Sequence, residues 1–457
     1  VLFRSEYASI DVSNERYEIE KYYDLEAMEV IASQRYDFIE KIKRECLEKK
    51  ETFETISDKL DKIFLNKYTA IPIFIIIMFL VYYLSVGVVG SFTVDLMEGL
   101  IVNFSELVKN GLTKLHASNW SISLLVDGII GGVGSVIAFI PQLIILFLLI
   151  SLLETSGYMA RISFILDRFF KRFGLSGKSL IPFILGTGCS VPGVMATRTI
   201  ENDSERKLTI LLTPFIPCSA KLPIIALFAS VFFPNHSGLV SASLYFFSVV
   251  VIIISAIILK KLFFKGESST YLLELPEYRL PSLSYTYQDV KNRTLAFIKK
   301  AGSIILFSSM IVSFLSSFSI RFTYGVDINE SILAYIGRGI SWVFYPMLGK
   351  LSWGASVSAL QGIIAKEQVV SSMHIIAGLS EGYNELLFTE TSIFGFFTPS
   401  SAYAFMVFNL FSAPCLGTIS AMKKEYNSTK LAFQAIVFQI CLAWLLGVIV
   451  YWVGNLL

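Results

Sequence analysis

Charged residues are scarce in this chain of 457 residues, because 16% of them are charged whereas 54% are hydrophobic. A soluble domain cannot bury that much apolar surface in one core, so the composition excludes an ordinary globular protein. Histidine occurs only three times, and no two histidines have the spacing of three or four residues that would join them in a local metal site. No arrangement of Ser, His and Asp indicates nucleophilic catalysis. We therefore expect no enzyme active site in this chain.

The sequence also has no phosphate-binding loop. Gly177-Lys178-Ser179 ends like the P-loop pattern GxxxxGK[ST], but Arg172 stands where the first glycine would be, and the motif follows a basic stretch instead of a strand. The chain should therefore not hydrolyse a nucleoside triphosphate by itself. Because it begins with Val1 and not with Met, we expect that a segment upstream is missing.

Cysteines are few, and their odd number of five does not indicate a disulfide framework. Cys46 lies in an amphipathic stretch and Cys441 in a plain apolar one, where a cysteine acts as a small hydrophobic residue. Cys189, Cys218 and Cys415 differ, because each lies beside Pro or Gly in an apolar run that cannot form one regular helix. We expect these three thiols, and not the other two, to have a function.

Long apolar runs dominate the rest of the chain. A bilayer core takes roughly 20 helical residues to span, and the charge-poor runs that reach this length are 71–92, 128–153, 222–259, 301–320, 391–422 and 431–457. Residues 234–238 interrupt the third run with Pro, Asn and Gly and should divide it into two helices. Since backbone groups in lipid must be satisfied within the protein, we predict an all-α, polytopic membrane bundle with at least six passages.

A soluble, helical N-terminal segment precedes these runs. Residues 1–68 hold more than a third of all charged residues, and apolar side chains at three-to-four spacing predict an amphipathic helix over 25–46. Lys and Arg are frequent in this segment, in 161–178 and in 260–300, but rare in 93–127. Because basic loops stay in the cytoplasm, the first three stretches should be cytoplasmic and 93–127 external.

Two of the selected cysteines lie among helix breakers. Residues 179–197 carry two prolines and three glycines around Cys189, and residues 214–223 carry three prolines around Cys218. Irregular backbone at membrane depth is found where it is buried in protein or lines a cavity, because its freed groups need partners there. We therefore expect irregular backbone over 186–193. The alternative is a kinked packing helix with a buried cysteine.

The second half of the chain repeats this layout. The apolar run 351–365 is too short to span a bilayer and ends at Lys366-Glu367. The dipeptide Pro-Cys then occurs at 414–415, as it does at 217–218. Short, interrupted segments at corresponding places in two halves indicate a transporter site at the interface between repeats.

Several motifs closely resemble those of the membrane domain of the ferrous-iron transporter FeoB family. They are LETSGYMAR (153–161), FGLSGKS (173–179), LGTGCSVP (185–192), MATRTIE (195–201), PCSAKLP (217–223), AKEQVV (365–370) and FNLFSAPC (408–415). The resemblance extends from the helical N-terminal segment to the C-terminus and implies two gate-type repeats with broken helices. The gate architecture alone is shared with nucleoside transporters, and a fold does not fix the substrate.

Ferrous iron is the transported substrate that the resemblance implies, and the chain contains donors that suit it. Fe²⁺ is borderline in softness and accepts thiolate, thioether and carboxylate ligands. The candidate metal ligands are Cys189, Cys218, Cys415, Met195, Glu154 and Glu367, and the candidate gating residues are Lys366, Asn409 and Ser219. Charged side chains at membrane depth are costly and functional by default.

Simpler explanations stay open for some of these residues. Lys366 and Glu367 could form a mutual ion pair that locks two half-helices, and Glu154 could be a helix end paired with Arg161. Met195 could be a packing residue, as methionine often is in membrane helices. We expect His374 to pack with its ring bonded to the backbone.

We expect six regions in the chain. They are a cytoplasmic helical linker that follows a lost GTP-binding domain (1–68), the first transmembrane helix with an external amphipathic region (69–140), the first gate repeat (141–262), a cytoplasmic connector (263–300), the second gate repeat (301–425) and a C-terminal transmembrane helix (426–457). GTP and Mg²⁺ would be bound only in the lost upstream domain.

The function implied is ferrous-iron uptake across the bacterial cytoplasmic (inner) membrane through a Cys-lined pathway, coupled in the full-length protein to GTP binding. The expected partners are ferrous iron and the lipid bilayer, and the resemblance allows a small cytoplasmic accessory protein and a homo-oligomer but no nucleic acid. The alternative is a transporter of nucleosides or other small solutes with the same gate architecture. Metal dependence of transport separates the two. A purely structural membrane protein is disfavoured by the charges at Lys366-Glu367.

Overall fold

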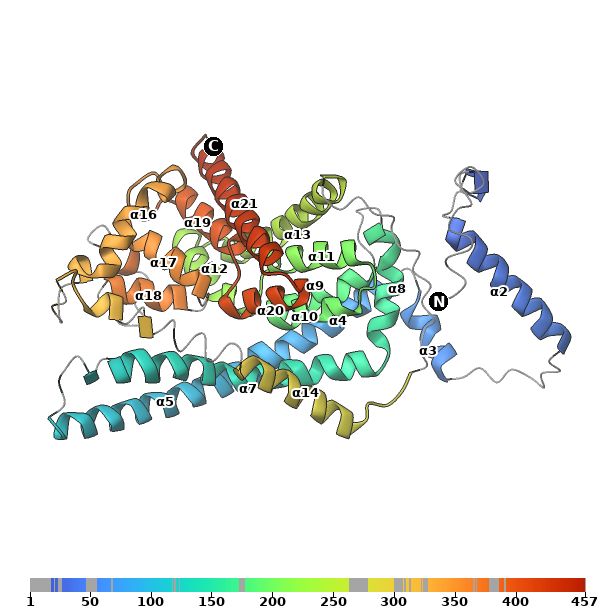
Figure 1. Cartoon of the computed structure of the whole chain (residues 1–457), viewed down its shortest axis with the longest axis horizontal. Helices are drawn as coiled ribbons and strands as arrows, with labels where there is room; N and C mark the ends of the chain where they lie inside the picture. Colours follow the sequence, from blue (N-terminus) through green and yellow to red (C-terminus); the bar gives the residue numbers. More distant parts are fainter. Residues whose placement is uncertain are drawn as a thin grey trace.

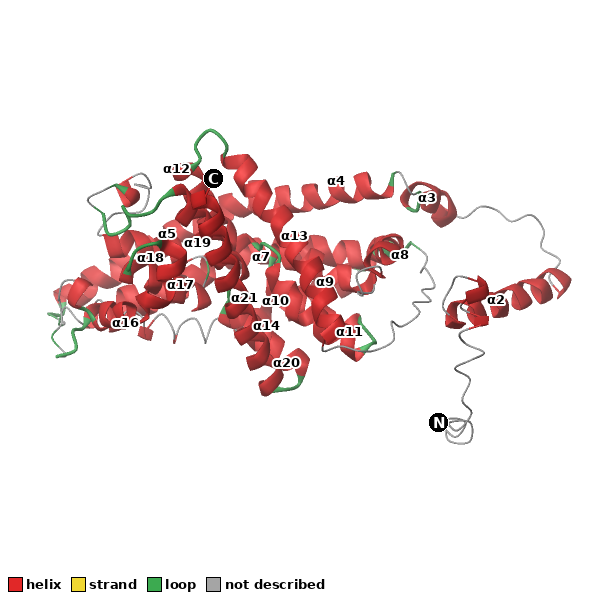
Figure 2. Cartoon of the chain, turned by 90° about the horizontal axis from the view of Figure 1, so that it is seen from above, coloured by secondary structure: helices red, strands yellow, loops and turns green. Residues whose placement is uncertain are grey.

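Helices account for nearly all regular structure of the chain (Figure 2). The computed structural model describes residues 18–19, 21–23, 27–46, 56–66, 69–116, 118, 121–122, 124–171, 177–262, 278–299, 307, 310–311, 314–321, 323, 328–364, 366, 368–377, 386–389 and 392–456. Within these residues, β-type pairing is limited to an isolated bridge between Ser319 and Ser331. The all-α prediction is confirmed.

The described residues of the N-terminal part are almost entirely helical. They are α2 (Ala27–Cys46), α3 (Ile56–Phe64), α4 (Ala70–Tyr82), the π-helical turn η2 (Tyr83–Val88), α5 (Val89–Lys114), the π-helical turn η3 (Leu124–Ile130), α7 (Gly131–Thr155) and α8 (Tyr158–Lys171). Helices α5 and α7 lie side by side along one edge of the molecule (Figure 1). The helix predicted over 25–46 is confirmed as α2.

A sharp bend separates α7 from α8. The axes of Ile140–Thr155 and Tyr158–Ile165 differ by 74°. Gly157 lies at the bend with φ 83°, a left-handed conformation that a residue without Cβ adopts most readily. The bend turns α8 away from α7, toward α4 and α9.

The middle of the chain is made of short helices followed by one long helix, α13. They are α9 (Leu180–Gly188), α10 (Ser190–Ala196), α11 (Asp203–Leu212), the 3₁₀ turns η6 (Thr213–Phe215) and η7 (Ser219–Lys221), α12 (Leu222–Phe232) and α13 (Ser237–Leu262). Helices α9 and α10 pack backbone to backbone, since a methyl group added at Gly193 would lie 2.8 Å from Pro182 O. The break predicted at 234–238 is confirmed, because α12 ends before it and α13 begins within it.

The C-terminal part begins with a helix that lies along α7. The helices are α14 (Leu283–Phe297), α16 (Ile332–Leu348), α17 (Trp353–Ile364), α18 (Gln368–Ala377), α19 (Pro399–Phe411), α20 (Leu416–Tyr426) and α21 (Thr429–Leu456). Helix α19 packs against α21 and α12, and α20 packs against α10. The two halves of the chain therefore meet at the centre of the molecule (Figure 1).

Four helical segments in the described part of the chain are long and apolar enough to cross a membrane. They are Asp203–Phe232, Ser237–Leu262, Pro399–Tyr426 and Thr429–Leu456, and the bent pair of α7 and α8 would make a fifth. The sequence predicts at least six passages, and two reasons explain the difference. The run 71–92 is divided by the π-helical turn η2, and half of 301–320 lies outside the described residues.

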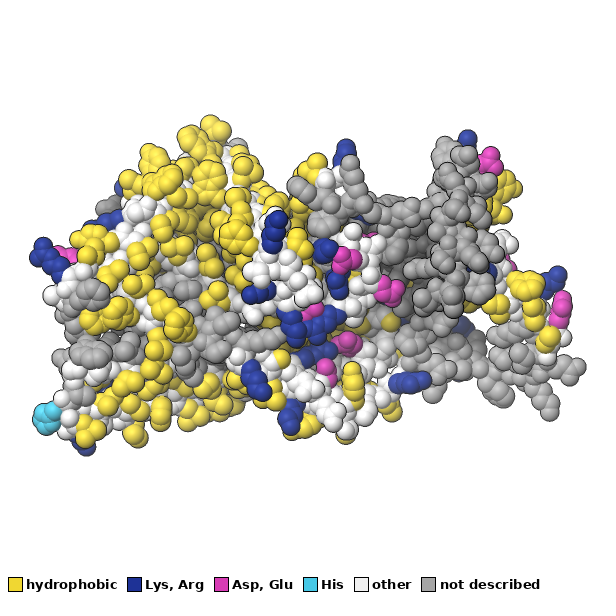
Figure 3. Space-filling model, in the orientation of Figure 1, with side chains coloured by type: hydrophobic (Ala, Val, Ile, Leu, Met, Phe, Trp, Pro, Cys, Tyr) yellow, Lys and Arg dark blue, Asp and Glu magenta, His cyan; other side chains and the backbone are white. Residues whose placement is uncertain are grey.

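The surface separates apolar from charged regions (Figure 3). On the face shown, apolar side chains cover α16, α19 and α21, whereas Lys, Arg, Asp and Glu side chains gather over α11 and α20. Helix α21 exposes large side chains such as Phe433, Leu445 and Trp452. A contiguous apolar surface of this kind suits contact with lipid.

Candidate functional site

Three cysteines occupy equivalent structural positions. Each lies at an interruption between helical segments and immediately precedes the second of them. Cys189 separates α9 from α10 with extended backbone angles, φ −151° and ψ 130°. Cys218 precedes η7 and α12 with φ −97° and ψ 166°, and Cys415 precedes α20 with φ −57° and ψ 155°. Each cysteine therefore lies at the amide end of a helical segment, where the helix dipole favours negative charge.

The break at Cys189 is narrower than the sequence predicts. We expected irregular backbone over 186–193, but only Cys189 lies outside the helices there. Pro182 and Pro192 lie in the first turns of α9 and α10. Amide groups in a first turn make no hydrogen bond within the helix, so the amide hydrogen that proline lacks is not needed there. The prolines therefore begin helices instead of unwinding the segment between them.

Side chains from elsewhere in the chain bind the carbonyl ends that the breaks expose. Ser219 Oγ donates to Gly188 O at the end of α9, over 2.8 Å. Lys366 Nζ donates to Asn409 O, near the end of α19, over 2.9 Å. The predicted gating residues thus lie at two breaks, and Lys366 and Asn409 are in direct contact. The backbone acceptors stay satisfied at membrane depth, as they must.

Two of the three breaks fall near the middle of a membrane span. Cys218 interrupts the span Asp203–Phe232, and Cys415 interrupts the span Pro399–Tyr426. The Pro-Cys correspondence between the two halves is therefore also a structural one. Discontinuous helices near the bilayer midplane are the usual place of a transporter site.

Two buried lysines meet at the second of these breaks. The side chains of Lys221 and Lys366 are 3% and 1% exposed. Lys221 Nζ donates to Leu410 O over 2.7 Å, and Lys366 Nζ donates to Ser412 Oγ over 2.6 Å. The Pro-Cys motifs lie next to these contacts, since Cys218 O accepts a hydrogen bond from Lys221 N over 2.9 Å and Cys415 follows Ser412 by three residues. Thiols and lysines from both halves thus form one cluster.

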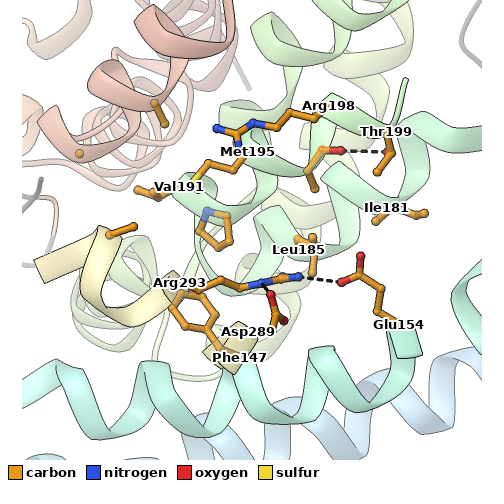
Figure 4. A pocket seen from close by; sticks show the side chains of 15 residues that line it. Phe147, Glu154, Ile181, Leu185, Val191, Met195, Arg198, Thr199, Asp289 and Arg293 are labelled. Atoms are coloured by element: carbon orange, nitrogen blue, oxygen red, sulfur yellow. Dashed lines mark hydrogen bonds and ion pairs between the residues drawn. The ribbon is translucent and has the colours of Figure 1, made fainter. Parts of the chain in front are cut away.

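A cavity of about 290 Å³ lies where α7, α9, α10, α14 and α20 meet (Figure 4). Glu154 and Met195, two of the predicted metal ligands, both line it, together with Asp289. Cys189 packs against the cluster of Leu143, Phe147 and Val290, of which Phe147 forms part of the cavity wall. The cavity therefore brings a carboxylate and a thioether predicted from the sequence close to one of the predicted thiols.

An arginine of α14 closes one side of this cavity. Arg293 Nη2 donates to Glu154 Oε2 over 2.9 Å, and Arg293 Nε donates to Asp289 Oδ1 over 2.9 Å (Figure 4). Burial alone would lower the pKa of Arg293, but the two carboxylates raise it above its ordinary value. The guanidinium thus keeps its charge and joins the end of α7 to α14.

The pairing of Glu154 with Arg161, considered from the sequence, is wrong. Arg161 is buried and pairs instead with Asp61 of α3, with Nε–Oδ1 2.6 Å and Nη2–Oδ2 3.1 Å. The guanidinium also lies 3.8 Å from the ring centroid of Tyr278, and burial raises the pKa of that tyrosine hydroxyl. Arg161 therefore joins α3, α8 and the residues that lead into α14.

The other selected residues are more dispersed. Glu367 lies outside the described residues, so its ion pair with Lys366 and its role as a metal ligand stay predictions. His374 is buried with Nδ1 3.0 Å from Val370 O, which confirms the expected backbone contact. Cys46 and Cys441 are exposed and lie in the regular helices α2 and α21, away from the breaks. Within the described part of the chain, no three His, Cys, Asp or Glu side chains converge as a preformed metal site.

Sequence reasoning missed Lys221, Asp289 and Arg293. Lys221 could have been found by the criterion that selected Lys366, because it is a lysine between prolines in an apolar segment. Asp289 and Arg293 gave no such signal, since they lie in a polar stretch. Their place in the cavity depends on how α14 packs against α7.

Two family models match the chain. The model described as Gate, nucleoside recognition, matches residues 136–232 and 298–429. The model described as the C terminus of ferrous iron transport protein B matches residues 242–293. The first match covers all three Cys breaks, both lysines and Glu154. No solved structure matches the chain significantly.

Curated relatives named Fe(2+) transporter FeoB match the chain almost throughout. The protein of Staphylococcus aureus (strain MSSA476) is 40% identical over 407 residues, which are 89% of this chain and 60% of the relative. That of Methanocaldococcus jannaschii is 37% identical, over 93% of this chain and 63% of the relative. That of Campylobacter jejuni is 33% identical, over 92% and 69%. The chain thus spans about 60% of the length of the first of these relatives. From its similarity to them and to the family models, this multi-pass membrane chain belongs to the FeoB family, of which it represents the membrane portion.

Proposed function

We propose that this chain carries ferrous iron across the bacterial cytoplasmic membrane through its broken helices. The relatives named Fe(2+) transporter support the substrate. The observation that carries the proposal is the common position of Cys189, Cys218 and Cys415, each at the amide end of a helical segment beside a break. A soft donor placed there can exchange its bond to water or protein for a bond to Fe²⁺.

Two donor sets follow one another along the proposed pathway. The first consists of Cys218 and Cys415 in the middle of two spans. The second consists of Cys189, Met195 and Glu154 around the cavity of about 290 Å³. Because no metal site is preformed among the described residues, iron would bind weakly at each set, which suits conduction better than tight capture.

Stretches that the positive-inside rule assigns to the cytoplasm come together in space. Asp61 from 1–68 binds Arg161 from 161–178, and Tyr278 from 260–300 lies over the same guanidinium. Contacts of this kind require the three stretches to lie on the same side of the membrane. We therefore place the N-terminus and the cavity with its Glu154–Arg293 pair at the cytoplasmic end.

The remaining features of the full-length protein extend this proposal. The six regions given above remain our prediction of the domain boundaries. Coupling to a GTP-binding domain would reach the membrane part through α3, the described helix of 1–68 that contacts α4 and the buried Arg161. A small cytoplasmic accessory protein would bind on the cytoplasmic side, and a homo-oligomer would form within the bilayer.

The test is iron entry into liposomes that contain this chain. Cys→Ser substitution keeps the size and removes the soft donor, and an imperfectly paired hydroxyl costs about 1–3 kcal/mol of stability, so the variants should fold. Entry of Fe²⁺, read by quenching of an enclosed chelating dye, should fall at least about tenfold for the serine variants of Cys189, Cys218 and Cys415. Cys46→Ser and Cys441→Ser are matched controls that should transport at the parent rate.

Equal iron entry for all five serine variants would contradict thiol ligation. Entry of a labelled nucleoside without any metal dependence would instead support the nucleoside reading of the Gate model. Protein incorporated per vesicle must be matched, because lower abundance would imitate a lower rate.

A further inference from the structure

The end of α19 binds two ammonium groups at once. Lys221 Nζ donates to Leu410 O at 2.7 Å, and Lys366 Nζ donates to Asn409 O at 2.9 Å and Ser412 Oγ at 2.6 Å. The last carbonyls of a helix have no helical partner and carry the negative end of its dipole. Here the acceptors of one helix end are shared between two cations.

The turn η6 and the residue after it supply the remaining acceptors of this cluster. Lys221 Nζ also donates to Pro214 O over 2.6 Å and to Ile216 O over 3.3 Å. Together with the end of α19, these groups form a cage of carbonyl and hydroxyl oxygens around two positive charges. Oxygen cages of this type also coordinate metal cations, which take carbonyl and hydroxyl groups as ligands.

No carboxylate among the described residues forms an ion pair with either lysine. The ion pairs found there involve Arg161, Lys178, Arg198, Arg206, Lys207 and Arg293 as the cations. Two like charges that are buried close together repel each other strongly at low dielectric. Packing alone does not require this arrangement, because an apolar side chain of similar size would avoid the repulsion.

A further acceptor at this place has no partner among the described residues. Asn409 is 1% exposed and its Nδ2 donates to Phe405 O, but no group in the described part of the chain donates a hydrogen bond to its Oδ1. Gly362 lies beside this oxygen, since a methyl group added there would be 3.2 Å from Oδ1. A buried amide oxygen without a partner is costly. It is an additional oxygen donor for a cation that enters the cage.

We propose that Lys221 and Lys366 are tethered cations that occupy a cation site at the carboxyl end of α19, and that the transported cation and the ammonium groups alternate there. With both ammonium groups bound, the oxygen cage is filled and an arriving dication is repelled. When an ammonium group withdraws, the same oxygens and the neighbouring thiols of Cys218 and Cys415 become available. The identity of the transported cation rests on the proposed function, whereas the occupied cage rests on the geometry of this cluster.

The test compares three variants of the whole chain in lipid nanodiscs. Lys366→Ala removes the tethered cation and leaves space, and Lys366→Met removes the charge but fills the space. Lys178→Ala is the control, because Lys178 pairs with Glu201 outside this cluster. Thermal unfolding is followed with increasing n-propylammonium, which replaces the atoms that Lys366→Ala removes. Lys366→Ala should be stabilised saturably, whereas the parent, Lys366→Met and Lys178→Ala should not respond.

Mn²⁺ is the second probe, and its binding is read from the signal of the free ion in electron paramagnetic resonance. Lys366→Ala should bind Mn²⁺ about tenfold or more tightly than the parent, because one competing like charge is gone. If Lys366→Ala does not fold, Lys221→Ala replaces it in both measurements. Lack of any response to n-propylammonium and Mn²⁺ in a folded alanine variant would overturn the tethered-cation site and leave the lysines as a structural cap.

The two proposals fail separately in these experiments. A parent chain that admits no Fe²⁺ into liposomes would refute the proposed function, while rescue of Lys366→Ala by n-propylammonium would still establish the cation site. Iron entry by the parent without rescue would support the transport proposal and overturn the tethered cations.

Discussion

Replacing Asp61 by asparagine should release α3 from the membrane portion of the chain. Asp61 accepts two hydrogen bonds from Arg161, at 2.6 and 3.1 Å, and the Arg161 side chain is 1% exposed. The asparagine amide would keep the size but lose the charge, so the guanidinium would stay buried without its counter-ion. The stacked ring of Tyr278 and the bond from Arg161 Nη1 to Gly157 O would compensate only in part.

The size of the effect follows from the burial of the pair. Breaking a buried ion pair from one side costs about 3–5 kcal/mol, and the 22% exposure of Asp61 reduces this to about 2–4 kcal/mol. Because about 1.4 kcal/mol corresponds to a factor of ten, opening of α3 should become about 30- to 1000-fold more frequent. Hydrogen exchange of the α3 amides, measured by mass spectrometry in nanodiscs, reports this opening directly.

Two controls make the measurement specific. Lys178→Met breaks an exposed ion pair with Glu201, whose side chain is 87% exposed, and should leave exchange in α3 unchanged. The double variant Asp61→Asn with Arg161→Met removes both charges and should lose less than the sum of the single variants. Exchange within about threefold of the parent in Asp61→Asn would refute the reasoning, because an energy below about 1 kcal/mol is what an exposed pair contributes.

Two further predictions concern the packing around the cavity. Gly193→Ala should lower the thermal midpoint by an amount equivalent to about 1–3 kcal/mol, because the methyl group would meet Pro182 O at 2.8 Å. Gly238→Ala, with open space around it, is the control. Equal midpoints for the two variants would contradict the close contact of α9 and α10. Glu154→Gln should raise hydrogen exchange in α14 by less than about fivefold, since its pair with Arg293 is partly exposed (side chains 43% and 24%) and such pairs contribute about 0–1 kcal/mol. A much larger rise would show that this pair, and not the packing of α14 on α7, holds the helix in place.

The helix breaks were predictable from the sequence because they depend on local chemistry. Proline lacks an amide hydrogen and glycine has no Cβ, so their positions limit where a helix can begin or continue. The sequence therefore located the breaks at Cys189, Cys218 and Cys415. It overestimated the unwound length at the first, since a proline in the first turn of a helix is compatible with regular structure.

The partners of buried charges were not predictable in the same way. Lys221 and Lys366 are far apart in the sequence, and both reach the end of α19 only because of how the helices pack, with α12 against both α18 and α19. Likewise Arg161 lies close in sequence to Glu154, yet its partner is Asp61. A periodic pattern predicts which face of a helix is buried, but the packing of helices decides which charges meet there.

The two lysines should act differently when the repeats move relative to each other. Lys366 and the end of α19 both belong to the predicted second repeat, so the bonds from Lys366 to Asn409 and Ser412 can persist when that repeat moves as a body. Lys221 belongs to the first repeat, and its bond to Leu410 O crosses between the two. Any motion that separates the repeats at this point must therefore break the bond from Lys221 to Leu410 O, which exposes a carbonyl at the end of α19 while Lys366 can keep its own bonds. Alternating access built on this contact would free Leu410 O in each opening, while Pro214 O and Ile216 O stay with Lys221. Lys221 would therefore govern how easily the passage opens, and Lys366 how well the remaining site is closed.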